Sequence, residues 1–248
     1  MFDPAILVIL GGAAVGFLLA VFGGGGSVLA APVLLYLGGV PDPHIAIGTA
    51  SAAVAANALF NLAGHWRGGR IKWPCAVVFS IAGLAGSFAG STLAKLIDGQ
   101  QLLLAFAAAM AAIGLSMFRR PASEGDPNVH INMRLVLRLA PLGLLTGMAA
   151  GFFGIGGGFL IVPGLMLATG MTMANATASS LLSVALFGAA TSANYALSGL
   201  VDWWLAGLLL LGGVIGGVFG LMLAKRLSTR ALLARRLFAG LIVLVAGY

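Results

Sequence analysis

Phe22-Gly23-Gly24-Gly25-Gly26-Ser27 is the stretch that decides the fold, because a similar block, Phe153-Gly154-Ile155-Gly156-Gly157-Gly158, follows in the second half. Each block precedes a proline, Pro32 or Pro163, at the same spacing from its phenylalanine. Glycine weakens a helix by about 1 kcal/mol per residue relative to alanine. Three or four consecutive glycines in an apolar segment therefore predict a helix that breaks at each block.

Other blocks repeat together with the glycine-rich ones. Thr49-Ala50-Ser51 returns as Thr177-Ala178-Ser179, and the segment 69–73 returns as 199–203. Three spaced glycines also recur: Gly83, Gly86 and Gly90 match Gly213, Gly216 and Gly220. Two copies of one unit, each with a broken helix, are typical of membrane transporters built from internal repeats.

The composition places the chain in a lipid bilayer. With 60% hydrophobic residues, 8% charged residues and a mean hydropathy of +1.09, its 248 residues offer too little polar surface for a soluble globule. The net charge of +7 comes from Lys and Arg in short gaps between apolar runs, which orients helices and does not indicate nucleic-acid binding. One cysteine, Cys75, excludes an internal disulfide, and no Cys/His spacing predicts a metal site or a cofactor.

Charges, glycines and prolines divide the chain into eight apolar stretches: roughly 5–37, 44–64, 74–94, 101–118, 139–168, 173–198, 203–224 and 231–248. Six of them approach the ~20 residues that one helical crossing needs. The first and the fifth are about 30 residues long, half as long again as one crossing requires, and contain the glycine blocks. Each is expected to form two half-helices, either as a hairpin that returns to its own side or as a broken helix that crosses.

Basic residues favour the hairpin. The gaps 67–72, 119–138 and 225–236 hold 12 of the 13 Lys and Arg residues. A hairpin in the fifth stretch places all three gaps in the cytoplasm, as the positive-inside rule requires. The internal similarity then favours a hairpin in the first stretch as well, and with both hairpins the two termini lie outside. The prediction is an all-α integral membrane protein with two inverted repeats, each with one re-entrant hairpin and three transmembrane helices. Residues 1–120 form the first repeat, 121–134 a polar cytoplasmic linker and 135–248 the second repeat.

The predicted topology suggests a role for the glycines. Hairpins from opposite faces can bring their tips together near mid-membrane, where irregular backbone needs protein or water around it. A half-helix leaving such a tip starts with unpaired N–H groups and a positive dipole end, which favour an anion. Gly26-Ser27 and Gly157-Gly158 would supply these groups. The alternative is close helix packing, which we expect for Gly86-xxx-Gly90 and Gly212-xxx-Gly216-xxx-Gly220.

Two polar stripes run through the apolar frame. One comprises Thr49, Asn57, Asn61 and His65 at four-residue multiples, and the other Ser180, Ser183, Thr191 and Asn194. Hydroxyl and amide groups can bind an oxyanion without a full countercharge; the alternative is that they hydrogen-bond helices to one another. All six acidic residues lie at or near the ends of stretches, so we expect no carboxylate relay or cation site at mid-membrane. The sequence has no HExxH, Gly-x-Ser-x-Gly or phosphate-loop motif, and we do not expect an enzyme.

The repeated blocks resemble the TauE/SafE sulfite exporter family. The resemblance rests on a Phe-Gly-x-Gly-Gly-Gly-x-Leu-x-x-Pro block in each half, an Ala-x-x-Thr-Ala-Ser block and a Gly-x-x-x-Trp turn, with Ser27 in place of one motif glycine. It covers nearly the whole chain and implies a multi-pass carrier of the bacterial inner membrane that exports small sulfur oxyanions or organosulfonates. Motifs and stripes together supply the substrate-binding candidates Gly23, Gly24, Gly25, Gly26, Ser27, Thr49, Ser51, Asn57, Gly154, Gly156, Gly157, Gly158, Thr177, Ser179 and Ser180.

The leading prediction is a secondary transporter that exports a small anion, with sulfite or an organosulfonate as its partner. Outward movement of a monoanion gains about 2.3 kcal/mol per 100 mV of inside-negative potential, so no coupled ion is required. Two alternatives stay open. A channel for a small solute would show no counterflow, and a membrane assembly factor would bind no anion. Assembly into a homo-oligomer also stays open.

Overall fold

The computed structural model describes residues 3–119, 125–126, 129, 131–154, 158–227 and 240. This part of the chain is helical nearly throughout, as the composition predicts. The elements are α1 (Pro4–Phe22), the 3₁₀ helix η1 (Gly23–Leu29), α2 (Ala30–Pro32), the π-helical η2 (Val33–Leu37), α3 (Pro43–Trp66), α4 (Trp73–Ala94), α5 (Gly99–Arg119), α6 (Met133–Phe153), α7 (Gly158–Thr169), α8 (Met173–Ala196) and α9 (Trp203–Leu227). The sequence stretch 231–248 lies outside the described residues except for position 240.

Within the described residues, six helical segments are long and apolar enough to cross a membrane. They are Pro4–Leu37, Pro43–Trp66, Trp73–Ala94, Met133–Phe153, Met173–Ala196 and Trp203–Ala224. Large apolar side chains point outward from several of the helices: Ile81 is 65% exposed, Leu104 72% and Phe219 62%. An outward apolar surface of this kind suits lipid and would be unfavourable in water. The chain is therefore a multi-pass membrane protein.

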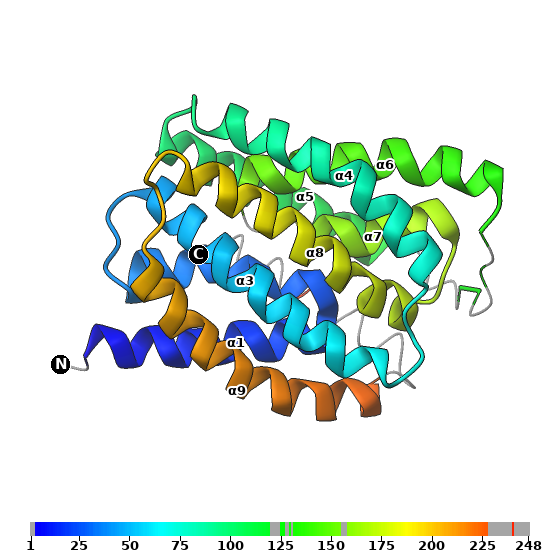
Figure 1. Ribbon diagram of the computed structural model, residues 1–248, viewed down its shortest axis with the longest axis horizontal. Coiled ribbons are helices and arrows are strands. Elements are labelled where there is room, and N and C mark those ends of the chain that lie inside the picture. The colour runs from blue at the N-terminus through cyan, green and yellow to red at the C-terminus, as the bar shows by residue number, and fades with distance from the viewer. Residues whose placement is uncertain are drawn as a thin grey trace.

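α3 and α8 form the centre of the molecule and run antiparallel (Figure 1). The start of α3 lies against the end of α8, because a Cβ built on Gly48 would lie 2.9 Å from the Tyr195 Cβ. Further along, a Cβ on Gly188 would lie 3.1 Å from the Ser51 carbonyl oxygen. Residues at equivalent places near the starts of these two helices consequently lie toward opposite ends of the bundle.

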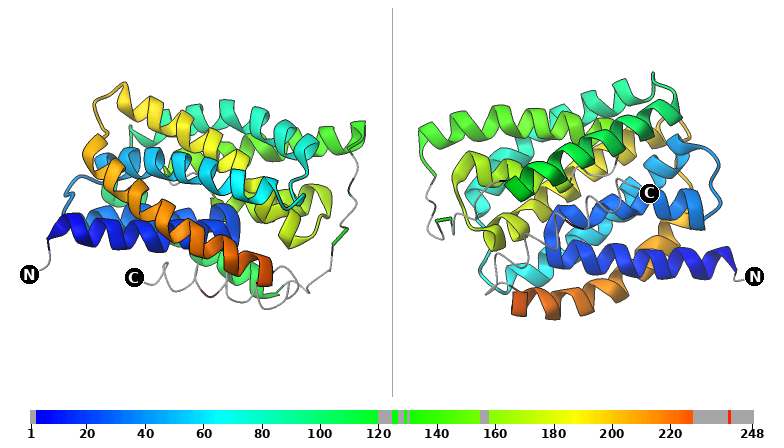
Figure 2. Two further views of the ribbon diagram at one scale, coloured as in Figure 1. Left: turned by 60° about the horizontal axis from the view of Figure 1, so that its bottom comes forward. Right: turned by 180° about the vertical axis from the view of Figure 1, so that it is seen from behind.

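Two glycine-rich helix pairs flank this centre, α1 with α9 on one side and α4 with α6 on the other (Figure 2). A Cβ on Gly216 of α9 would overlap the Ala13 carbonyl of α1. In the other pair, a Cβ on Gly86 of α4 would overlap the Leu144 carbonyl of α6. The prediction that the spaced glycines are packing residues is confirmed, since only a hydrogen fits where the backbones meet.

The chain reverses direction at the first glycine block. Gly23 ends α1 with φ +63°, a conformation that favours glycine. Beyond it the chain returns along α1: a Cβ on Gly26 would overlap the backbone of Leu18 and Leu19, and one on Gly38 would lie 3.2 Å from Val8. The helix break predicted for this stretch is therefore a turn back along α1.

The second glycine block ends α6 in the same way. Gly154 caps the helix in the left-handed region, with φ +66°. α7 then returns along α6, so that a Cβ on Gly164 would lie 3.1 Å from the Thr146 methyl group. Residues 155–157, which include the predicted site glycines Gly156 and Gly157, lie outside the described residues, and Gly158 starts α7.

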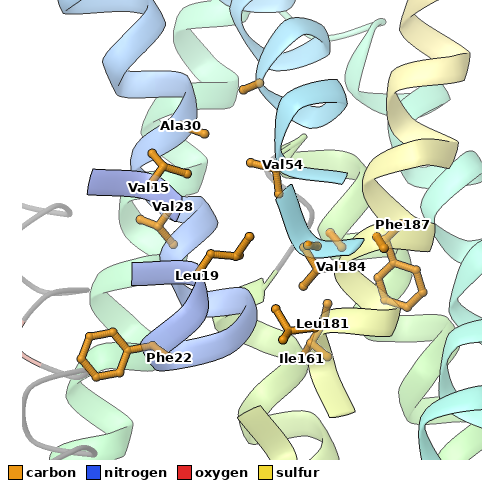
Figure 3. Packing of buried hydrophobic residues seen from close by; sticks show 14 of the residues in the cluster. Val15, Leu19, Phe22, Val28, Ala30, Val54, Ile161, Leu181, Val184 and Phe187 are labelled. Atoms are coloured by element: carbon orange, nitrogen blue, oxygen red, sulfur yellow. The ribbon is translucent and has the colours of Figure 1, made fainter. Parts of the chain in front are cut away.

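An apolar layer fills the space between the two reversals (Figure 3). Leu19 and Val28 from the first reversal, Val54 from α3, Val184 from α8 and Ile161 from α7 are each 0% exposed. Because lipid tails are as apolar as these side chains, close packing of the layer, and not removal of its surface from water, holds both reversals against the central helices.

Acidic side chains cap helix starts, in line with the prediction that they lie at segment ends. The carboxylates of Asp3 and Asp42 accept the backbone N–H of Ala5 and His44 respectively. Asp98 and Asp202 cap α5 and α9 in the same way. A carboxylate at an N-cap satisfies a free N–H group and suits the positive end of the helix dipole, so helix-end chemistry accounts for these positions.

Candidate functional site

The first reversal is held by the central helix of the other half. The Gly24 N–H donates to the Ser180 hydroxyl on α8 at 3.2 Å, and the Ser180 hydroxyl donates to the Thr177 carbonyl at 2.8 Å. Gly23 lies so close that a Cβ would stand 2.5 Å from both Ser180 Oγ and the Thr177 carbonyl oxygen. Gly24 and Ser180 are completely or almost completely buried. Four predicted site residues therefore meet at one buried point.

The remaining residues of this block serve the turn itself. The Ser27 hydroxyl donates to the Gly24 carbonyl at 2.7 Å. Because Gly23–Leu29 is a 3₁₀ helix, the amides of Gly26 and Ser27 are engaged by carbonyls three residues earlier. Gly25 lies buried within the same 3₁₀ helix. Gly26 packs directly on the backbone of α1, so its missing side chain is explained by close approach and not by an open anion cradle.

The second reversal makes the reciprocal contact. The Ser51 hydroxyl on α3 is directed at two carbonyls, that of Gly154 at the end of α6 and that of Ile47 at 2.8 Å. A Cβ on Gly154 would overlap the Ile47 side chain. Ser51 is 0% exposed. Each reversal is thus bonded to a buried serine on the central helix of the opposite half, Ser180 for the first and Ser51 for the second.

The two reversals do not meet at one point. Ser51 lies beside Gly188, and Ser180 precedes Gly188 by eight residues of α8, or about 12 Å of helix rise. The Gly24 and Gly154 contacts are separated along the bundle by a similar distance. The described ends of the two reversals, Gly24 and Gly154, thus do not come together as expected from the sequence. The apolar layer described above lies between them.

Thr49 and Ser179 hold loops at opposite ends of the bundle. The Thr49 hydroxyl accepts the backbone N–H of Asp202 at 2.9 Å, and the Ser179 hydroxyl accepts that of Lys72, also at 2.9 Å. Gly48, next to Thr49, touches Tyr195, which is sixteen residues or about 24 Å along α8 from Ser179. Thr49, Ser51, Thr177 and Ser179, which the sequence predicts to form one substrate-binding set, therefore do not lie together. The reason is the antiparallel course of α3 and α8, which carries equivalent helix-start residues apart.

Comparison with known proteins shows which family has this architecture. The family model described as sulfite exporter TauE/SafE matches residues 8–248. This chain belongs to the TauE/SafE family. It is 48% identical over 244 residues to a "Probable membrane transporter protein" of Xylella fastidiosa strain 9a5c, covering 98% of this chain and 94% of that protein. It is 26% identical over 250 residues to the "Probable membrane transporter protein YunE" of Bacillus subtilis, covering 92% and 90%. No solved structure gives a significant match.

Membership in the TauE/SafE family identifies a membrane transporter and not an enzyme. In this family member, the predicted polar stripe of α3 is buried and only partly bonded. Asn57 is 0% exposed, and neither its Nδ2 nor its Oδ1 has a hydrogen-bond partner among the described residues. Asn61 Nδ2 donates to the Asn57 backbone carbonyl at 3.0 Å, but Asn61 Oδ1 is unpaired. The ring of His65 bonds the Ala20 carbonyl through Nε2 at 2.9 Å.

The stripe of α8, in contrast, is bonded to residues that the sequence reasoning did not single out. Serines of α4 face it: Ser80 pairs with Ser183 at 2.7 Å, and Ser87 pairs with Thr191 at 3.0 Å. Their spacing of seven residues, which keeps one face of a helix, is the signal that could have revealed them. At the end of the same interface, Lys95 Nζ donates to the Asn194 side-chain oxygen at 2.9 Å and the Ser198 hydroxyl at 2.9 Å.

Proposed function

We propose that this TauE/SafE family member is a secondary carrier of the bacterial inner membrane that exports a small anion, with sulfite or an organosulfonate as the favoured substrate. The family description names sulfite export, whereas the curated relatives carry only the general name of membrane transporter. The observation that carries the proposal is the reciprocal pairing of Gly24 with Ser180 and of Ser51 with Gly154. It gives each half a buried, uncharged polar contact to the other at a helix reversal.

The halves are proposed to be inverted repeats, 1–120 and 135–248, joined by the linker 121–134. Support comes from the antiparallel course of α3 and α8 and from the matched bonds of Thr49 to Asp202 and of Ser179 to Lys72. In this arrangement both reversals are re-entrant hairpins, and the three basic gaps face the cytoplasm. Both termini then lie outside.

We place substrate binding around the two reversals, next to Ser51, Ser180, Asn57, Gly24 and Gly154. The Ser180 hydroxyl now donates to a carbonyl, and an oxyanion beside it could accept that hydrogen instead. Because one hydrogen bond is exchanged for another, the net change in free energy is small, and neither capture nor release needs a large barrier. The capping carboxylates of Asp3, Asp42 and Asp202 lie at the bundle ends, where they do not repel an anion at mid-membrane.

Transport into proteoliposomes tests this function. Purified protein is reconstituted with labelled sulfite, taurine or sulfoacetate outside and the same unlabelled compound inside. A carrier produces counterflow, in which label accumulates transiently; a channel does not. Ser51→Ala and Ser180→Ala are expected to lower the rate per folded molecule. The control is Thr146→Ala, since Thr146 bonds only carbonyls of its own helix. Absence of uptake for all three compounds would refute the assignment of substrate class.

A further inference from the structure

The two central helices meet their outer neighbours through interfaces of opposite character. On one side, α8 packs on α4 and side-chain hydrogen bonds cross the contact. Ser80 bonds Ser183, Ser87 bonds Thr191, and Asn194 donates to Ser91 and Thr92 at 2.7 and 2.8 Å; Lys95 then ties α4 to Asn194 and Ser198. This interface is closed along most of its length by satisfied polar groups.

On the other side, α3 packs on α9 with its side-chain amides only partly bonded. Gly213 of α9 lies against the Asn57 amide, since a Cβ on Gly213 would stand 2.5 Å from Asn57 Oδ1. A Cβ on Gly217 would stand 2.9 Å from Asn61 Oδ1. Both asparagines are 0% exposed, and within the part of the chain that the structure describes Asn57 Nδ2, Asn57 Oδ1 and Asn61 Oδ1 have no hydrogen-bond partner. Buried polar atoms in folded proteins are normally bonded. A polar solute or water that bonded Asn57 and Asn61 would therefore lower the free-energy cost of burying these amides.

The difference lies at matched positions of the two halves. Asn57 follows the first residue of α3 by fourteen residues, and Phe187 follows the first residue of α8 by the same number. Asn57 covers Gly213 of α9, whereas Phe187 covers Gly83 of α4 and stacks on Phe79 with ring centroids 6.4 Å apart. The Asn57 amide at the α3–α9 contact thus occupies the position that the Phe187 ring fills at the α8–α4 contact.

The line of polar side chains on α3 continues from Asn57 and Asn61 toward the end of the bundle that carries Arg67 and Arg70. His65 lies eight residues beyond Asn57 on the same face and is 2% exposed. Since a carbonyl can only accept, the His65 ring donates from Nε2 to Ala20 of α1, and among the described residues its Nδ1 has no partner. Past His65 the loop carries Arg67, and Arg70 Nη1 reaches the Ala224 carbonyl of α9 at 3.5 Å. Among the described residues of this mouth, the bonds of His65 to Ala20 and of Arg70 to Ala224 each involve a single side chain.

We propose that the α3–α9 interface is the passage through which a small hydrated oxyanion moves between the end of the bundle at Arg67 and Arg70 and the reversals, with Asn57 and Asn61 as its contact residues. This inference rests on the proposed function. Asn57 Nδ2 offers hydrogens to an oxyanion, and the two amide oxygens accept from its water or from an O–H group. The passage opens when the tightly packed pair α1 and α9 moves away from α3, which releases the His65 bond to Ala20.

Thiol labelling tests the passage without any transport measurement. In a Cys75→Ala background, Asn61→Cys is compared with Thr191→Cys, because both positions follow the start of their helix by eighteen residues. The probe is 2-sulfonatoethyl methanethiosulfonate, a small sulfonate that reacts with thiols exposed to water, applied to inverted vesicles. We expect the thiol at 61 to react at least about tenfold faster than the thiol at 191. Equal rates, or faster reaction at 191, would overturn the passage.

A second comparison separates contact with solute from a structural role. Asn57→Leu removes unpaired polar atoms and is expected to melt at or above the wild-type temperature while transport falls severalfold. The control is Asn194→Leu, which loses its bonds to Ser91 and Thr92 and should melt lower. A lower melting temperature for Asn57→Leu would indicate that the Asn57 amide is hydrogen-bonded in the wild-type protein and would contradict the proposal. If labelling succeeds but no sulfur anion is transported, the substrate class fails while the passage stands.

Discussion

Ser51 on α3 directs its hydroxyl at the carbonyl of Gly154, the residue at which α6 ends and the chain turns back. The partner relationship in the other half joins Ser180 on α8 to the N–H of Gly24. The two bonds differ in direction, since Ser51 donates whereas Ser180 accepts. This difference predicts unequal consequences when each hydroxyl is removed.

Ser180→Ala is expected to lower the free energy of unfolding in detergent by about 1–3 kcal/mol, because it leaves the buried Gly24 N–H unpaired. Ser51→Ala should have a smaller effect, since a carbonyl left with fewer bonds is tolerated better than an unpaired N–H. Thermal unfolding of the purified variants measures both. A larger loss for Ser51→Ala than for Ser180→Ala would contradict this reading of the two bonds.

Thr49→Val and Ser179→Ala should each loosen one loop and leave the other unchanged. Each hydroxyl accepts a backbone N–H at the start of a helix, that of Asp202 for Thr49 and that of Lys72 for Ser179. Loss of such a bond is expected to cost about 1 kcal/mol locally. Hydrogen exchange should be faster at the Asp202 amide in the first variant and at the Lys72 amide in the second. Faster exchange at both amides in either variant would indicate that the two ends are coupled.

Two glycines of α9 should respond oppositely to alanine. A Cβ on Gly216 would overlap the Ala13 carbonyl, whereas no atom lies within 4 Å of a Cβ on Gly207. Gly207→Ala is expected to raise stability by up to about 1 kcal/mol through helix propensity, and Gly216→Ala to lower it. Gly86→Ala is also expected to lower stability, because the added Cβ would overlap the Leu144 carbonyl. Melting temperatures of the three variants provide the test, and equal effects at 207 and 216 would refute close packing of α1 on α9.

Gly26→Val should reduce the amount of folded protein together with transport. The added side chain would overlap the backbone of Leu18 and Leu19, so the turn back along α1 cannot close. Sulfite uptake per folded molecule, with folded protein measured by size-exclusion chromatography, distinguishes this from direct loss of binding. Normal amounts of folded but inactive protein would instead indicate that Gly26 contacts the substrate.

The orientation of the chain can be tested at two loop glycines with the same backbone. Gly69 and Gly199 both have positive φ and open space at the Cβ position, so cysteine is strained to a similar degree at each. With Cys75 replaced, an impermeant thiol reagent added outside intact cells should label position 199 and spare position 69. Labelling of both positions from one side would contradict the proposed topology.

Much of the architecture could be predicted from the sequence, because it depends on local properties. Apolar composition and segment length predict helices in a bilayer, since backbone groups there must be bonded within the segment. Consecutive glycines predict the reversals at Gly23 and Gly154, where positive φ is required. Spaced glycines predict close helix pairs, and carboxylates at segment ends predict caps.

Only the tertiary structure decided which groups face one another. The repeated sequence blocks align Thr49 with Thr177. In the structure, however, Thr49 and Ser179 have the same role: each lies six residues after the start of its helix and accepts a backbone N–H from a loop. A two-residue shift of this kind changes the face of a helix, and the sequence does not reveal it. Likewise, four polar residues on one face of α3 look alike in the sequence. Packing decides their partners: Thr49 bonds Asp202, 153 residues along the chain, and His65 bonds Ala20 of α1, whereas the Asn57 side chain has no partner among the described residues.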